Sequence, residues 1–420
     1  MSATRSAARP GAPAGPAPGN LAIAGRPARP CRVMVVHNRY QIRGGEDAVV
    51  ERESAALARA GVDTEVVLVS NDDIRSPLDR LRAAAEVAHA DRGIATVLAA
   101  LDRFRPDVVH LHNTFPLISP AVHRAVRATG AATVQTLHNY RVTCANAQLA
   151  RDGRPCEDCV TGSPYNAVLH GCYRGSRLGS LAVARMIDVH RRCGTWTEDV
   201  DRFVALTPFA KSRFVAAGLP AERIVVKPNG LSDPGRPSGR ARSGILYVGR
   251  LSPEKGVLVL GAAARLARVP IAMLGDGPLA GELARLGGPS LLGAGDRGAV
   301  GAAMAGARAL AVPSLWYEGL PMVIAEAFAA GTPVIASRIG ALPDIVEDGV
   351  TGLLVRPGDA ADLARAADWI ADHPVEAARM GAAARAVFEA RWSEEITTAS
   401  LLSIYAEAVA SRSGGSRHGA

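Results

Sequence analysis

Two acidic residues stand eight positions apart in an otherwise apolar run, SLWYEGLPMVIAEAFAAG, near the C-terminal third of the chain. Pro321 suits the first turn of a helix that runs to about Ala330, because its fixed φ fits a helix and its missing N–H is not needed there. Glu318 then lies in the loop just before the helix, and Glu326 lies about a turn and a half inside it. The pair is therefore predicted to lie at one end of a helix.

The amino end of this predicted helix can bind phosphate through free backbone amides, including those of Gly319 and Leu320. Two carboxylates would repel a diphosphate, so we expect them to accept hydrogen bonds from hydroxyl groups on either side of it. Glu318 would bind sugar hydroxyls and Glu326 would bind ribose hydroxyls. The alternative interpretation is that Glu318 caps the helix and Glu326 extends to solvent.

The positive charge that a diphosphate requires is available in the segment YVGRLSPEKG. Arg250 follows a predicted strand there, and Lys255 precedes a predicted helix. Gly249, directly before Arg250, is assigned to the same site. The alternative is that the two cations are solvated loop residues without a ligand.

Polar residues also follow predicted strands in the first half of the chain. Gly44 and Gly45 open a helix, which suits close approach of the backbone to phosphate or sugar. The strand DVVHLHN places His110 and His112 on the same side, and His138 follows the next strand. We predict that His112 and His138 line a ligand cleft; the alternative is that they are hydrogen-bonded core residues.

Short β-rich runs alternate with helix-like segments twice along the chain, which predicts an α/β fold with two parallel sheets. The predicted strands are RVMVVHN, TEVVLVS, DVVHLHN, ATVQTLHN, RFVALT and RIVVKPNG in the first series, and ILYVGR, PIAMLGDG, SLLG, RALAVPS, TPVIAS and TGLLVRPG in the second. Ligands of such sheets bind at the carboxyl ends of the strands, so two facing sheets would form a cleft.

The composition of the chain divides it into two Rossmann-like, doubly wound domains and two tails. Apolar periodicity is lost where Pro, Gly and Ser dominate, which predicts a linker. A long helical pattern near the C-terminus is expected to pack back on the first domain. The predicted boundaries are a disordered tail over 1–30, the first domain over 31–230, the linker over 231–243, the second domain over 244–392, the returning helix over 393–410 and a tail over 411–420.

The net charge of +8 over 420 residues is concentrated in the tails. The first 30 residues hold four arginines and no acid, and the last ten add two arginines. This distribution argues against a folded nucleic-acid-binding surface. No uncharged apolar run is long enough for a membrane span, and the N-terminus lacks the apolar segment of a signal peptide. We expect a cytoplasmic protein.

Several motifs of the second half resemble, in this order and spacing, the donor half of retaining glycosyltransferases of family 4, which have the GT-B fold. They are VGRLSPEKG, GDGP, PSLWYEGLPMVIAEAFAAGTPVIAS and GLLVRPGD. Glu318 and Glu326 match the E-x7-E motif of that family. The resemblance covers roughly residues 31–410, more loosely in the first half. It implies two domains that face a cleft, the first binding an acceptor and the second a nucleotide-activated sugar.

The resemblance also implies roles for single residues. Arg250 and Lys255 would bind the donor diphosphate and stabilise the leaving group, while Glu326 would hold ribose hydroxyls. Glu318 and His112 would contact the transferring sugar. The family's reaction is attack by the acceptor hydroxyl on the same face as the departing phosphate, which accepts the proton, with no cofactor for catalysis.

The expected partners are a UDP- or GDP-sugar and a glycan or lipid-linked glycan, by resemblance to enzymes of surface polysaccharide synthesis. Contact with the inner face of the membrane is a further expectation. One alternative is a non-catalytic sugar-nucleotide-binding or scaffold protein of the same fold. Another is a nicotinamide dehydrogenase, but the expected G-x-G-x-x-G does not follow RVMVVHN.

Asp199 and Asp201 form a D-x-D sequence, which binds a metal and a diphosphate in glycosyltransferases of a different fold. Here the motif precedes the strand RFVALT instead of following a strand. We therefore predict a solvated turn and no catalytic metal.

A segment with four cysteines, CANAQLARDGRPCEDCVTGSPYNAVLHGC, has a C-x2-C pair at its centre. Four thiolates can close a tetrahedral zinc site and hold such a polar loop together, so Cys144, Cys156, Cys159 and Cys172 are predicted to bind structural zinc. The alternatives are scattered buried thiols and a redox-active pair. Similar cysteine-containing loops occur in a subset of family 4 enzymes. The five arginines of the next segment, 173–193, are expected to form either a solvated helix face or a contact with anionic lipid.

Overall fold

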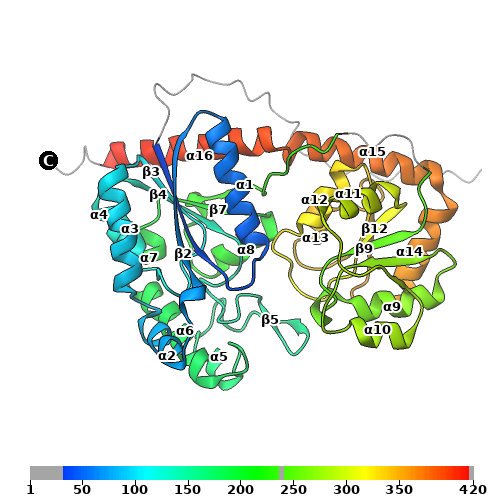
Figure 1. Ribbon diagram of the computed structural model, residues 1–420, viewed down its shortest axis with the longest axis horizontal. Coiled ribbons are helices and arrows are strands. Elements are labelled where there is room, and N and C mark those ends of the chain that lie inside the picture. Colours follow the sequence, from blue (N-terminus) through cyan, green and yellow to red (C-terminus); the bar gives the residue numbers. More distant parts are fainter. Residues whose placement is uncertain (1–31, 236–240, 416–420) are drawn as a thin grey trace, which may run out of the picture. The chain divides into compact units, whose positions relative to one another are not determined.

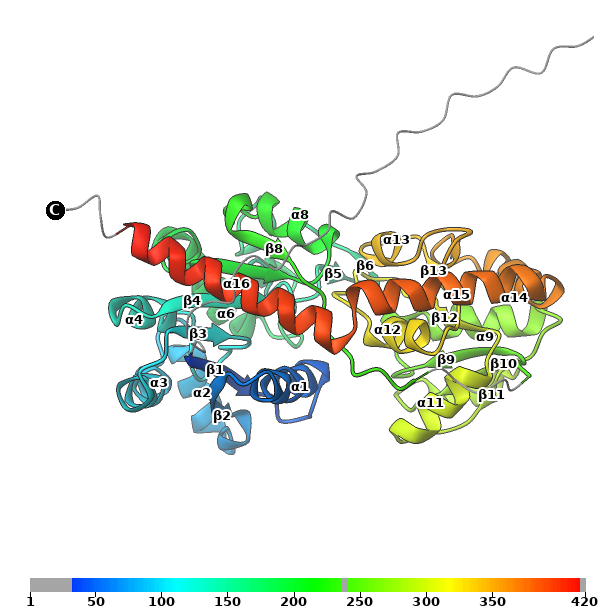
Figure 2. The same ribbon diagram turned by 90° about the horizontal axis from the view of Figure 1, so that it is seen from above.

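The computed structural model describes residues 32–235 and 241–415 (Figures 1 and 2). The predicted N-terminal tail, the centre of the predicted linker and the last five residues lie outside the described residues. None of the helices within those two ranges is both long enough and apolar enough to span a membrane.

The first sheet has six strands in the order β2-β1-β3-β4-β7-β8, and every neighbouring pair is parallel. Its strands are β1 (Arg32–Arg39), β2 (Asp63–Ser70), β3 (Val108–Leu111), β4 (Ala132–Leu137), β7 (Arg202–Ala205) and β8 (Ile224–Val226). Residues alternate between the two faces of β1. Met34 and Val36 belong to one hydrophobic core and Val33 and Val35 to another, so both faces of the sheet are covered.

The helices of this half connect its parallel strands (Figure 1). They are α1 (Gly45–Arg59), η1 (Asn71–Asp73), α2 (Pro77–Glu86), α3 (Asp91–Phe104), α4 (Val122–Ala128), α5 (Asn166–Leu169), α6 (Arg177–Arg192), α7 (Thr195–Glu198), α8 (Pro208–Ala216) and η2 (Ala221–Arg223). A two-stranded hairpin, β5 (Ala150–Arg151) and β6 (Arg154–Pro155), lies in the cysteine segment. This hairpin has no counterpart among the strands predicted from the sequence.

The second sheet also has six parallel strands, in the order β11-β10-β9-β12-β13-β14. They are β9 (Ile245–Val248), β10 (Ile271–Leu274), β11 (Ser290–Leu291), β12 (Ala309–Val312), β13 (Val334–Ser337) and β14 (Gly352–Val355). The helices are η3 (Pro253–Lys255), α9 (Val257–Leu266), α10 (Ala280–Leu286), α11 (Arg297–Gly306), α12 (Met322–Ala329), α13 (Leu342–Ile345), α14 (Ala360–Asp372) and α15 (Pro374–Arg391). The twelve strands of the two sheets coincide with the twelve predicted β-rich runs, which confirms the two-sheet α/β prediction.

Helix α16 (Glu394–Gly415) returns from the second half and packs on the first sheet (Figure 2). Its residues Leu401, Ile404 and Tyr405 share a core with Val33 and Val35 of β1. The helix continues to Gly415, so residues 411–415 are helical where the sequence predicted a tail. The apolar face of α16 therefore completes the core of the first half.

Candidate active site

Glu318 and Lys255 form a buried ion pair at the carboxyl edge of the second sheet. Glu318 follows β12 and is 5% exposed, and Lys255 ends η3. The Nζ atom of Lys255 lies 2.8 and 2.9 Å from the two carboxylate oxygens of Glu318. The hydroxyl of Ser314 donates a third hydrogen bond to Glu318, at 2.6 Å. Glu318 therefore does not cap the helix, since α12 has no side-chain cap.

The position of Lys255 depends on close backbone packing behind it. Gly256 has a φ of 69°, and a Cβ atom there would lie 1.9 Å from the carbonyl oxygen of Pro313. The backbone N–H of Leu315 donates to the carbonyl of Glu254 at 2.9 Å. Glycine thus allows the loop after β9 to pack against the loop after β12, and this packing brings Lys255 to Glu318.

Arg250 lies on the same edge, but its side chain is mostly exposed. Its guanidinium donates to Glu254 at 2.8 Å, and the hydroxyl of Ser252 donates to the same carboxylate oxygen at 2.6 Å. Gly249 before it has a φ of 147°, and a Cβ atom on Gly275 would lie 1.9 Å from the Gly249 carbonyl oxygen. The loops after β9 and β10 therefore touch at these two glycines. The exposed side chain of Arg250 is accessible to an anionic ligand.

Glu326 occupies the second turn of α12 and is partly buried. Burial raises the pKa of this carboxyl group, and the positive charges of Arg52 and Arg297 act against that shift. The structure assigns Glu326 no hydrogen bond to any described residue, so its oxygens can accept hydrogen bonds from a ligand. The alternative that Glu326 extends into solvent is not what the structure shows.

The start of α12 differs by one position from the prediction. Pro321 is the residue before the helix, with φ −72° and ψ 102°, and Met322 is the first helical residue. The ψ angle is extended, so Pro321 was wrongly assigned to the first turn. The backbone at Gly319 and Leu320 still leads into a helix end without a side-chain cap.

A cluster of histidines lies at the carboxyl edge of the first sheet. The Nδ1 atom of His112 is 2.8 Å from Nε2 of His138, and the two rings stack with centroids 5.1 Å apart. The rings of His110 and His112 lie 4.1 Å apart, as their spacing along the strand predicted. Both nitrogens of His110 are taken, at 2.7 Å each, by the hydroxyls of Tyr405 and Thr136. His110 is therefore a structural residue, and His112 and His138 form the pair predicted to line the cleft.

A buried ion pair that was not predicted from the sequence lies beneath this cluster. Lys227, directly after β8, lies 2.6 Å from a carboxylate oxygen of Glu53 on α1. The other oxygen of Glu53 is 3.4 Å from Nε2 of His112. Burial acts to raise the pKa of Glu53, but Lys227, His112 and His110 outweigh it and hold that pKa well below its ordinary value. Lys227 could have been found, because it is a charged residue at the end of a predicted strand.

Gly44 and Gly45 lie at the amino end of α1, where acidic groups surround them. A Cβ atom on Gly45 would meet no atom within 4 Å, so the space in front of it is open. The N–H of Gly44 donates to Asp47 at 2.7 Å, and Asp47 also contacts His37 at 2.8 Å. Glu46 accepts from the Tyr40 hydroxyl at 2.9 Å and from the Asn139 amide at 2.7 Å. Two carboxylates in this first turn favour hydroxyl groups over phosphate as the ligand.

Oxygen and nitrogen atoms of Glu53, His110 and His112 lie within 4.8 Å of one another, a spacing that suits a metal. The hydrogen bonds already described fill both nitrogens of His110, and Lys227 holds one oxygen of Glu53. We therefore assign this group as a hydrogen-bonded network.

The D-x-D residues are structural rather than solvated, which corrects the prediction. Asp199 is 2% exposed and lies 3.3 Å from the guanidinium of Arg124. A carboxylate oxygen of Asp201 accepts from the backbone N–H of Thr133 at 2.7 Å and lies 2.9 Å from Arg412. These contacts tie the turn before β7 to β4 and α16.

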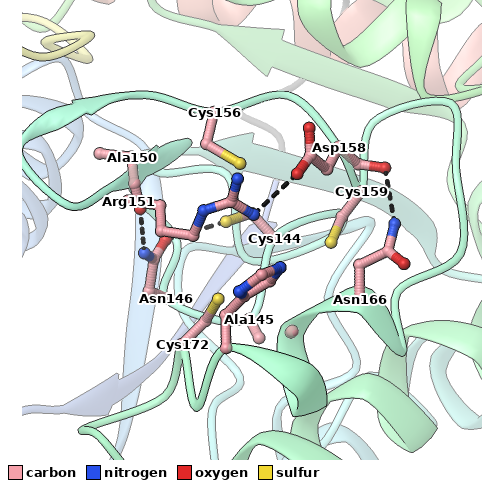
Figure 3. A pocket seen from close by; sticks show the side chains of 12 residues that line it. Cys144, Ala145, Asn146, Ala150, Arg151, Cys156, Asp158, Cys159, Asn166 and Cys172 are labelled. Carbon is pink, nitrogen blue, oxygen red and sulfur yellow. Dashed lines mark hydrogen bonds and ion pairs between the residues drawn. The ribbon is translucent and has the colours of Figure 1, made fainter.

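The four cysteines of the predicted zinc site line a single pocket in the first half (Figure 3). All are free thiols, as is Cys193, which is exposed and outside the pocket. Burial and the neighbouring thiols raise the pKa of Cys159 to about 11. The four thiols therefore share one pocket, and three of them are only partly buried.

Comparisons with known proteins agree with this geometry. Residues 44–230 match the family model of a glycosyl transferase 4-like domain, and residues 242–373 match that of glycosyl transferases group 1. A D-inositol 3-phosphate glycosyltransferase of Mycobacterium leprae is 33% identical over 407 residues, covering 87% of this chain and 89% of that protein. Its counterpart from Actinosynnema mirum is 28% identical over 409 residues, covering 87% and 92%.

A crystal structure of Anabaena HepE in complex with UDP-glucose matches the fold with a TM-score of 0.61 and 18% identity. The match covers 89% of this chain and 99% of the other. The two family models together cover every strand of both sheets except β1, and they include the loops that hold Lys255, Glu318 and His112. The chain therefore belongs to the group 1, family 4-like glycosyltransferases, retaining enzymes of GT-B fold that use a nucleotide-sugar donor.

Proposed function

We propose that the protein transfers a sugar, with retention of configuration, from a UDP-sugar to a hydroxyl group of a glycan or lipid-linked glycan. The observation that carries the proposal is the Lys255 and Glu318 ion pair, next to the uncapped amino end of α12. The cation and the free amides at this sheet edge match the diphosphate of such a donor, and the carboxylate matches its sugar hydroxyls.

Donor binding would exchange the partners of this ion pair. The diphosphate brings more negative charge than one carboxylate, so Lys255 would move from Glu318 to the phosphate oxygens. Glu318 would then be free to accept hydrogen bonds from sugar hydroxyls, and exposed Arg250 would add a second cation. Stabilising the charge that develops on the leaving diphosphate is the main contribution to rate that these residues can make. The partly buried Glu326 would hold ribose hydroxyls.

In the first half, His112 and His138 would bind the transferring sugar or the attacking hydroxyl. Burial and the neighbouring His112 keep the pKa of His138 well below its ordinary value, so this ring is neutral near pH 7. A neutral imidazole can both donate and accept hydrogen bonds. The Glu53 carboxylate beside His112 would favour a positive charge that develops on the sugar during transfer.

The acceptor is the less specific part of the proposal. The relatives named D-inositol 3-phosphate glycosyltransferase suggest a second candidate, an inositol phosphate. The open space at Gly45 is bordered by Glu46 and Asp47, which would repel a phosphate. We therefore favour an uncharged hydroxyl acceptor. A cytoplasmic location with peripheral membrane contact is part of the same proposal, because a lipid-linked acceptor would be reached there.

A product assay tests the proposal. The purified protein is incubated with UDP-glucose, UDP-galactose, UDP-N-acetylglucosamine or GDP-mannose, alone and with lipid-linked glycans or D-inositol 3-phosphate. We expect a UDP-sugar to give UDP and an α-linked product with a glycan, seen by chromatography and proton NMR. Product formed with D-inositol 3-phosphate and with no glycan would show that the acceptor is an inositol phosphate. Donor binding without turnover under every condition would favour a non-catalytic sugar-nucleotide-binding protein.

A further inference from the structure

We propose that Cys144, Cys156, Cys159 and Cys172 bind one zinc ion, which holds together the long loop after β4. The four thiols come from three stretches of residues 144–172 and line the same pocket. Figure 3 shows their sulfur atoms around the side chain of Arg151. Four convergent cysteines form the ligand set typical of a structural zinc site.

The local backbone resembles the hairpin and knuckle that zinc sites use. Asp152 and Gly153 have φ angles of 51° and 73°, which are typical of a tight two-residue hairpin turn. Cys156 directly follows this hairpin, and its N–H donates to the carbonyl of Leu149 at 2.7 Å. The C-x2-C pair therefore begins at the end of an ordered hairpin, which fixes the backbone of its first cysteine.

The second pair reaches the same pocket from other segments. Cys144 lies in the turn that Tyr140 opens, where its N–H donates to the Tyr140 carbonyl at 2.8 Å. Cys172 follows α5, and its N–H donates to Ala167 at 3.0 Å. The thiol of Cys144 donates to the side-chain oxygen of Asn146 at 2.9 Å. These positions surround the pocket without any disulfide among the described cysteines.

The sulfur atoms are wider apart in the structure than zinc ligands are. Among the described residues no three of them meet the 4.8 Å separation that Glu53, His110 and His112 meet. Cys156, Cys159 and Cys172 are only partly buried, so their side chains have room to rotate about the Cα–Cβ bonds. Such rotation would bring the sulfur atoms closer together. A Zn²⁺ ion bound by four thiolates carries two negative charges, and the Arg151 guanidinium offsets one of them. Asp158 holds that guanidinium in place at 2.7 Å.

The long loop after β4 has little regular secondary structure to stabilise it. Residues 140–176 contain only two strands of two residues and one helix of four, so few ladder hydrogen bonds stabilise them. Arg191 of α6 compensates in part by donating to the carbonyl oxygens of Cys159 and Gly162 at 2.8 and 3.1 Å. Long loops of this kind inside a compact domain are usually functional or need further stabilisation. Zinc would supply it next to His138 and Asn139.

Metal analysis of the full-length protein, purified without chelator, tests the proposal. We expect about one zinc ion per chain and at least about a tenfold loss in the double variant Cys156→Ser and Cys159→Ser. Cys193→Ser is the matched control and should retain the metal, since Cys193 lies outside the pocket. Zinc far below one per chain and equal in all three proteins would overturn the proposal.

Two measurements on the unmodified chain cover the case in which the double variant does not fold. Cobalt(II) in place of zinc should give the strong near-ultraviolet absorption of cobalt–thiolate bonds, and chelation should expose the chain to trypsin after Arg151, a partly buried residue of the hairpin. Iron with labile sulfide, or a mass two daltons lower from a Cys156–Cys159 disulfide, would contradict the zinc assignment. Unchanged proteolysis together with no cobalt–thiolate band would do the same.

Discussion

The ammonium group of Lys255 contacts both carboxylate oxygens of Glu318, at 2.8 and 2.9 Å, in a site where Glu318 is 5% exposed. Each residue is proposed to bind a different part of the donor. The ion pair balances the charge of each residue, and donor binding would replace one partner with a phosphate and the other with sugar hydroxyls. This arrangement explains how a buried carboxylate can stand next to the proposed site for a diphosphate.

Removing the cation of this pair should reduce the rate strongly. We expect Lys255→Ala to lower kcat by on the order of 10² or more, because loss of one group that stabilises developing charge typically costs that much. Steady-state kinetics with the preferred donor is the measurement. Arg365→Ala is the control, since Arg365 forms an exposed pair with Asp362 on α14. An equal effect of both variants would contradict the assignment.

Glu318→Gln keeps the shape of the side chain but removes the charge that holds Lys255. We expect weaker sugar handling, seen as a kcat reduced by about tenfold or more, with donor affinity equal or higher because Lys255 is free for the diphosphate. Comparison of UDP-sugar and UDP binding by calorimetry separates the two effects. Normal turnover by this variant would show that Glu318 does not contact the donor sugar.

Glu326→Ala should affect the nucleoside portion of the donor. Hydrogen bonds to a charged group contribute about 1.5–3 kcal/mol, so we expect affinity for UDP to fall roughly ten- to hundredfold. Glu347, an exposed residue after α13, provides the matched control as Glu347→Ala. Titration calorimetry with UDP alone suffices, because the predicted contact does not involve the sugar. Unchanged UDP affinity would exclude the ribose contact.

The buried pair of Glu53 and Lys227 should matter for stability as well as for the position of His112. Lys227→Met would leave a buried carboxylate unpaired, and breaking such a pair typically costs about 3–5 kcal/mol of unfolding free energy. Chemical denaturation measures the effect. Arg103→Ala breaks an exposed pair with Glu65 and should cost no more than about 1 kcal/mol. Similar losses of unfolding free energy in both variants would show that the buried pair contributes no more to stability than the exposed pair.

Stability should fall as the pH falls from 6.5 toward 4. Burial lowers the pKa of His190 to about 4, so between these values the unfolded chain binds a proton that the folded chain does not. Stability therefore rises with pH in this window, and at pH 5 the loss relative to pH 7.5 from this residue is about 2 kcal/mol. His190→Gln should reduce the pH dependence of the unfolding free energy by about this amount. His89→Gln, at an exposed position, should leave it unchanged.

Much of this fold could be predicted from local sequence. The strands were recognisable because buried parallel strands such as VVHL and VIAS are short apolar runs between helical segments. The polar residues that directly follow these strands marked the carboxyl edges of both sheets, because the ends of the apolar runs were recognisable. The short hairpin at Ala150 escaped notice, because two-residue strands leave no periodic pattern.

Contacts between distant segments were harder to predict. The partner of Glu53 is 174 residues away in Lys227, and a helical glutamate gives no sign of burial in its own sequence. The D-x-D turn looked solvated because its partners, Arg124 and Arg412, lie far along the chain. The helix was predicted to begin at Pro321, one residue too early, because the proline ring fixes φ but leaves ψ free to be extended.

Release of nucleoside diphosphate from a panel of UDP- and GDP-sugars, measured for the unmodified protein and for Lys255→Ala, decides whether this site turns over a nucleotide-sugar. We expect that at least one donor is turned over and that the substitution reduces the rate by on the order of 10² or more. The contrary result is that no donor is turned over, with or without acceptor, and that Lys255→Ala binds every donor as the unmodified protein does.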